Sequence, residues 1–261
     1  MSNENSNQLS NKQKMRLKII SCDVLFREVC LCAAHSRNIL DLDFLPKGLH
    51  DNPDVMRAEI QKKIDENLNN SYDALLLGYA LCSNGLVGVK ARNIPIVVPR
   101  AHDCITLFLG SREKYMQYHN DYPGTYYYTS GWFERSGVKV VERKAEDGQG
   151  LGKLYDEYVR KYGEDNAKYL MEFENSWLKN YSRVAFVDLD FVKFLNYCEE
   201  AKRIAEQREW NYDELPGDIV LIKKLIDAEW DEGEFMVIQP GEEITATYDD
   251  KILGCKKIKQ S

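Results

Sequence analysis

Short apolar runs separated by polar turns dominate the first hundred residues. These runs lie at 17–21, 40–45, 74–79 and 94–98, and they are mostly apolar rather than strictly alternating. Such runs are typical of strands that are covered on both faces, as in a parallel sheet with helical crossovers. The first half therefore predicts an α/β fold with a mainly parallel sheet and helices on both faces.

Helical patterns fill the intervals between these runs. After Cys22, three apolar residues at Leu25, Val29 and Cys32 fall on one helical face. Farther along, Asn52-Pro53 reads as an N-cap followed by proline at the first helical position. Both segments are therefore expected to be crossover helices.

The second half repeats this style less clearly. Strands are predicted at 138–142, 183–189 and 234–239, and helices at 151–179, 190–208 and 215–230. The polar, Gly-containing segment 144–150 is the one plausible internal boundary. We expect one domain over 15–255, or two Rossmann-like lobes at 15–145 and 146–255. Residues 1–14 are rich in Asn, Ser and Gln and are expected to be a disordered leader.

Charge and hydropathy narrow the class of protein. The formal net charge is −7 and the pI is about 5.3, which argues against a nucleic-acid partner. No apolar run approaches the roughly 18 residues of a membrane span, and no signal peptide is evident. We therefore expect a cytoplasmic protein with no membrane partner and with reduced thiols. Its seven cysteines are then expected to be core, metal-binding or catalytic residues rather than disulfides.

Three of the cysteines follow predicted strands. Cys22 follows the first strand, Cys82 the third and Cys104 the fourth, with His102 two residues before Cys104. In an open parallel sheet the carboxyl ends of the strands share one edge, and ligands bind there. Thiolates with an imidazole suit zinc, and three thiolates can hold an iron–sulfur cluster. We predict a metal site of Cys22, Cys82, His102 and Cys104; the alternative is that the cysteines only fill the core.

Other residues near this edge are candidates for binding or catalysis. The loop of Ser83, Asn84 and Gly85 could bring backbone amides to an anion, or it could be an ordinary turn. Arg100 could orient an anionic substrate, with a surface salt bridge as the alternative. Glu28 could act as a general base or orient a ligand, with a solvated helix face as the favoured alternative. Trp132 could stack on a large cofactor or line the core. Because Pro99 favours an extended backbone before it, we expect His102 and Cys104 to face the same crevice.

These motifs resemble a family known as domain of unknown function 1638. The matching stretches are IISCDVLFRE, LLLGYALCSNG, PRAHDCITLFLGS, TYYYTSGW and DIVLIKKLIDAEWDEGEFMVIQPGE, within residues 17–245. The resemblance implies one continuous domain whose motif blocks contain the four predicted metal ligands. Similar proteins tend to accompany corrinoid-dependent methyl-transfer proteins. The resemblance thus implies an enzyme or accessory factor of one-carbon metabolism, whose partner is a small molecule or a corrinoid protein.

The His102-Asp103-Cys104 element is also similar to the zinc motif of thiol-activating, cobamide-dependent methyltransferases. In those enzymes the distant cysteine comes after the motif, whereas Cys22 and Cys82 precede it here. P-loop, G-x-S-x-G and H-E-x-x-H motifs are absent from the sequence. An iron–sulfur redox module and a non-catalytic protein that binds a metal or a corrinoid stay open as alternatives. The sequence does not determine the oligomeric state.

Overall fold

A five-stranded sheet, sheet A, forms the centre of the computed structural model. The structure describes residues 13–67, 71–136, 159–161, 163–164, 166–167, 179–247 and 249–258. Sheet A has the order β2-β1-β3-β4-β8. Its strands are β1 (Arg16–Cys22), β2 (Ile39–Leu45), β3 (Ala74–Gly78), β4 (Ile96–Pro99) and β8 (Phe235–Ile238). The first four pair in parallel and β8 runs antiparallel to β4, so the sheet is mostly parallel, as predicted.

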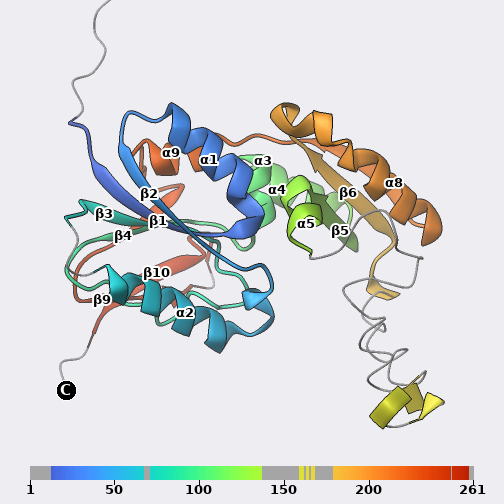
Figure 1. Cartoon of the computed structure of the whole chain (residues 1–261), viewed down its shortest axis with the longest axis horizontal. Helices are drawn as coiled ribbons and strands as arrows, with labels where there is room; N and C mark the ends of the chain where they lie inside the picture. The colour runs from blue at the N-terminus through green and yellow to red at the C-terminus, as the bar shows by residue number, and fades with distance from the viewer. Residues whose placement is uncertain are drawn as a thin grey trace, which may run out of the picture.

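Helices cover both faces of sheet A (Figure 1). On one face lie α1 (Phe26–His35) and α9 (Val220–Ile226), and on the other α2 (Pro53–Glu66). Neighbouring strand residues point to opposite faces. Thus Ile19 packs in the cluster of α1 and α9, whereas Ile20 packs against α2. The N-cap expected for α2 is present, because Asn52 Oδ1 accepts a hydrogen bond from Val55 N at 3.2 Å.

A second, three-stranded sheet, sheet C, is parallel with the order β5-β6-β7. It contains β5 (Thr125–Thr129), β6 (Arg183–Asp188) and β7 (Asn211–Pro216). Around it lie α3 (Cys104–Leu109), α4 (Arg112–Asp121), α5 (Ser130–Arg135) and α8 (Tyr197–Gln207). The 3-10 turn η1 (Asp23–Leu25) contacts α5, the turn η2 (Leu49–Asp51) contacts α2, and the turn η4 (Asp190–Leu195) precedes α8. An antiparallel hairpin joins β9 (Glu242–Ala246) to β10 (Leu253–Lys257).

The two sheets share a core on the α1 side of sheet A. Val187 and Leu189, at the end of β6, belong to the same apolar cluster as Leu17 and Ile19 of β1. The approach is close at Gly131 in α5, where a Cβ atom would lie 1.7 Å from the carbonyl oxygen of Val24. Only glycine fits such a contact between two backbones.

Most predicted strands are present within about two residues, but two predicted helices begin late. The helix expected at 190–208 is the 3-10 turn η4 followed by α8, which starts at Tyr197. The helix expected at 215–230 starts at Val220, because Leu215 and Pro216 complete β7. β7 is a polar edge strand with alternating exposure, and its sequence NYDELP resembles a loop. The predicted strand 138–142, the boundary 144–150, most of the helix 151–179 and most of the leader 1–14 lie outside the described residues. Among the described helices, none is long and apolar enough to span a membrane.

Candidate functional site

Three thiols gather at the carboxyl edge of sheet A. Cys22 ends β1, Cys82 follows β3 and Cys104 opens α3 after β4; these three strands are neighbours in the sheet. The thiols are close enough to influence one another. The charge of Cys22 contributes to the raised pKa of Cys82, and both contribute to that of Cys104. All seven cysteines of the chain are free.

Backbone hydrogen bonds fix two of these loops to each other. Leu81 N donates to the carbonyl of Ala101 at 2.9 Å, and Cys82 N donates to that of His102 at 3.0 Å. These bonds continue the pairing of β3 and β4 beyond the ends of the two strands. Cys82 is therefore held beside the loop that carries Cys104.

The backbone around Cys82 is strained. Cys82, Ser83 and Asn84 have φ angles of 46°, 53° and 69°, so three successive non-glycine residues are left-handed. Each such residue costs on the order of 1 kcal/mol or more, and such residues concentrate at functional sites. Gly85 closes the turn through its amide to Cys82 O at 2.9 Å. The anion-binding role suggested for this loop stays a prediction.

Burial makes the three thiols poor acids. It raises the pKa of Cys22 to about 11 and that of Cys82 to about 12, and it raises the pKa of Cys104 well above the usual value. Backbone amides of Val24 and Asp23, with the Lys47 ammonium, limit the rise at Cys22. At neutral pH the three thiols are therefore protonated unless a metal cation binds to them.

Tyr79 is a site residue that the sequence analysis missed. Its side chain is only 3% exposed, and its hydroxyl lacks a hydrogen-bond partner in the described part of the chain. Tyr79 belongs to the apolar cluster on the α2 face, against which Cys22 and Cys82 also pack. Burial chiefly, with the charges of these two cysteines, raises the pKa of Tyr79 far above its usual range. The signal available in the sequence was the alternation of Leu75, Leu77 and Tyr79 along β3.

The H-x-C element divides between solvent and protein interior. His102 is exposed, whereas Asp103 turns inward and caps α3, its Oδ1 accepting from Ile105 N at 3.0 Å. Asp103 Oδ2 also accepts a hydrogen bond from Tyr115 Oη at 2.7 Å. Cys104 is thus the first helical residue rather than part of an extended loop. The role of His102 as a metal ligand stays a prediction.

Arg100 is occupied by main-chain carbonyls. Its Nε donates to Glu232 O at 2.9 Å and Phe235 O at 3.2 Å, and its Nη1 donates to Lys251 O at 3.0 Å and Leu253 O at 2.5 Å. The guanidinium therefore fastens β8 and β10 together. This structural role does not require a substrate, and the substrate-orienting role stays a prediction.

Glu28 is fully buried, and both of its carboxylate oxygens lack partners in the described ranges. Burial raises the pKa of Glu28 to about 7, and the nearby Glu134 adds to the rise. Glu134 itself pairs with Arg27 at 2.6 Å, joining α5 to α1. Glu28 thus titrates near neutrality beside the contact between these two helices.

Trp132 faces a lysine rather than open space. Lys47 Nζ lies 3.8 Å from the centre of the Trp132 ring and donates to Ser136 Oγ at 2.6 Å. Tyr126 and Tyr128 contact the indole edge-on. Stacking of Trp132 on a cofactor stays a prediction.

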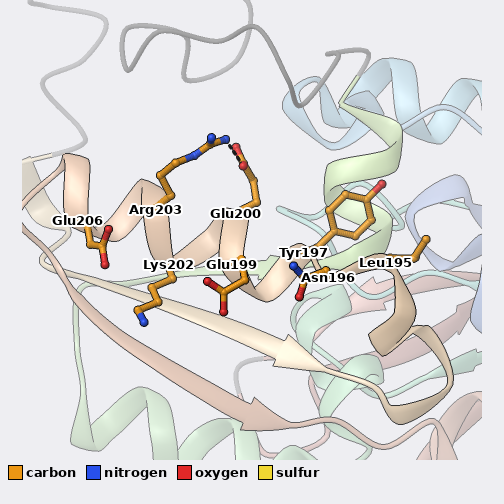
Figure 2. Close-up of a pocket in the computed structure, with 8 residues that line it drawn as sticks. All are labelled: Leu195, Asn196, Tyr197, Glu199, Glu200, Lys202, Arg203 and Glu206. Atoms are coloured by element: carbon orange, nitrogen blue, oxygen red, sulfur yellow. Dashed lines mark hydrogen bonds and ion pairs between the residues drawn. The ribbon is translucent and has the colours of Figure 1, made fainter.

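Two further observations bear on where a ligand could bind. Across the described ranges, no group of three or more His, Cys, Asp or Glu side chains is placed to hold a metal ion as it stands. A surface hollow of about 510 Å³ lies on another part of the molecule, along α8 (Figure 2). It is lined by Leu195, Asn196, Tyr197, Glu199, Glu200, Lys202, Arg203 and Glu206. None of the predicted site residues lines this hollow.

Fold and site together define an α/β protein with a thiol-lined sheet edge. The chain belongs to the family described as "Protein of unknown function (DUF1638)", which matches residues 44–226. Tyr79, Cys82 and Cys104 lie inside the matched segment, whereas Cys22 and Glu28 precede it. No curated protein and no solved structure matches the chain.

Proposed function

We propose that this chain is a metal-binding protein and that Cys22, Cys82 and Cys104 hold the metal. The observation that carries the proposal is the gathering of three free thiols from three neighbouring strand ends. A chain that needed cysteine only as a small apolar residue would have no reason to place three at one edge. The strained turn at Cys82 and the unpartnered hydroxyl of Tyr79 support a site at the same place.

The chemistry of the donors fits a soft metal ion. Thiolates favour zinc or iron over magnesium or calcium. A bound cation would also ionise thiols that are otherwise protonated, because metal binding displaces their protons. The thiols approach one another without reaching ligand spacing, so the proposal requires the loops that carry them to close on the metal. His102, exposed at the rim, is a fourth candidate ligand.

The chemistry such a metal supplies is that of a Lewis acid, which lowers the pKa of a bound thiol or water. The finer proposal places this chemistry in corrinoid-linked one-carbon metabolism, as an enzyme or accessory factor. Its support is the family resemblance noted in the sequence. The same proposal includes a Rossmann-like architecture and a cytoplasmic location, which suits a chain whose cysteines are all free. The lobes expected at 15–145 and 146–255 do not follow the sheets, because β5 pairs with β6 and β8 pairs with β4.

An iron–sulfur cluster is the second candidate for the same three thiols, because a cluster can be held by three cysteines with one iron left open to another ligand. Elemental analysis of anaerobically purified protein separates the two. Zinc near one atom per chain, in a colourless protein, supports the first proposal. Iron with sulfide and a brown colour supports the second. A protein that holds neither metal, and takes up neither when reconstituted, contradicts both.

A further inference from the structure

Tyr79 carries a buried hydroxyl that the fold itself does not use. The side chain is 3% exposed and its Oη is without a partner among the described residues. Two other tyrosine hydroxyls are bonded, since Tyr72 Oη donates to Asp41 and Tyr115 Oη donates to Asp103, each at 2.7 Å. Among the described residues, Tyr127 Oη shares the unbonded state of Tyr79, but Tyr127 lies on β5 of sheet C rather than at the end of β3. Tyr79 therefore departs from the rule that buried polar groups find a partner.

The position of Tyr79 shows where a partner for its hydroxyl could bind. Tyr79 follows directly after β3, on the α2 face, where Cys22 and Cys82 pack against the same apolar cluster. The charges of Cys22, Cys82 and Asp23 all act on the Tyr79 hydroxyl. Ser21 pairs with Gly78 where β1 and β3 run side by side, so the next residues, Cys22 and Tyr79, are neighbours on the α2 face. Among the described residues, no hydrogen-bond partner for Tyr79 Oη is present.

We infer that Tyr79 Oη donates a hydrogen bond to a small ligand held at the three thiols, and that this ligand carries a lone-pair acceptor, a thiolate or an oxyanion. This inference rests on the proposed metal site and names the residue that would recognise the ligand there. A tyrosine hydroxyl can both donate and accept, and it is the unused O–H donor that a ligand with a lone pair would engage. At Cys22 the Asp23 carboxylate disfavours negative charge and the Lys47 ammonium favours it, so the two charges oppose each other. Asp23, the nearby carboxylate, accepts a hydrogen bond from Lys47 N at 2.7 Å.

The energetic cost of burying the Tyr79 hydroxyl without a partner can be tested in metal-free protein. Leaving a hydroxyl buried and unbonded destabilises the fold, and an apolar group of the same shape avoids that penalty. In metal-free protein, Tyr79→Phe should therefore keep the melting temperature or raise it by about 2–4 °C. The matched control is Tyr72→Phe, which removes a hydroxyl bonded to Asp41 and should lower the melting temperature. A fall for Tyr79→Phe as large as that for Tyr72→Phe would show a partner within the fold and overturn the inference.

The ligand is tested on protein loaded with cobalt(II), whose visible spectrum reports bound thiolates and added ligands. The two probes are 2-mercaptoethanol, for a thiolate, and acetate, for an oxyanion. Tyr79→Phe should bind cobalt as the wild type does, yet bind the effective probe about tenfold more weakly. Equal probe affinity in both proteins, or no binding of either probe to the wild type, overturns the inference about Tyr79 but not the proposed metal site. Cobalt that binds neither protein overturns the metal site and the inference with it.

Discussion

The thiol edge of sheet A and the hollow along α8 present opposite kinds of surface. At the thiol edge, burial keeps the three thiols protonated, and the Tyr79 hydroxyl lacks a partner among the residues that the structure describes. Along α8 the groups are charged and Arg203 pairs with Glu200 (Figure 2). The hollow is a concavity, yet two of its charged side chains already pair with each other. The candidate site is therefore marked by buried groups that could still bind a ligand rather than by a hollow in the surface.

The same contrast separates Arg100 from Tyr79. Arg100 has the charge that suggests substrate binding, but four carbonyl oxygens accept its hydrogen bonds. Tyr79 has no formal charge, but its hydroxyl is buried and lacks a partner within the described part of the chain. The capacity of a residue to bind a ligand thus depends on which of its hydrogen-bonding groups are not already paired with neighbouring residues.

Glu28 offers the largest test of this contrast, because its buried carboxyl, like the Tyr79 hydroxyl, lacks a partner among the described residues. Its pKa is about 7 in the folded chain against 4.5 unfolded, so the folded state holds the proton more tightly. As pH rises from 4.5 to 7 the unfolded chain ionises first, and the wild type loses stability; above pH 7 the loss is complete. At 1.36 kcal/mol per pH unit, the loss is about 3 kcal/mol.

Glu28→Gln removes this titration. The variant should match the wild type near pH 4 and be more stable by about 3 kcal/mol at pH 8, measured by urea unfolding at each pH. The matched control is Glu206→Gln, an exposed residue of α8, which should change little at any pH. Parallel pH profiles for the wild type and Glu28→Gln would show that the buried carboxyl has a partner.

Asp103 gives an intermediate effect, because it lies at the thiol edge but is fully bonded. Asp103→Ala removes the cap of α3 and the partner of Tyr115, and should destabilise the chain by about 1–2 kcal/mol. It should also loosen any metal, since Cys104 follows in the next position. Asp103→Asn, which can still accept from the Ile105 amide, should recover most of the stability. Full stability in Asp103→Ala would contradict the capping role.

The α8 pair should give the smallest effect. Arg203→Ala breaks an ion pair whose arginine is 53% exposed, and should change stability by less than about 0.5 kcal/mol. It should leave metal content unchanged. Loss of metal in Arg203→Ala would move the site from sheet A to α8 and reverse the comparison.

The main elements and the gathering of the thiols follow from patterns within the sequence. The apolar runs of β1, β3 and β4 clearly predict buried strands. Parallel pairing then brings the carboxyl ends of these strands to one edge of the sheet. The polar edge strand β7 and the largely exposed helix α4 lack an apolar signal of that strength. The left-handed turn at Cys82–Asn84 contains no glycine to reveal it. The unbonded state of Tyr79 depends on groups from other strands, which local sequence does not specify.

The most direct test of the central claim is the metal content of single cysteine variants, measured on anaerobically purified protein. Cys82→Ser and Cys104→Ser should each fall well below one metal per chain, because a hydroxyl is a poor ligand for a soft metal. Cys198→Ser is the matched control, since Cys198 lies on α8 and should leave the content near that of the wild type. Equal metal content in all three variants would contradict the claim that the thiol edge of sheet A is the metal site.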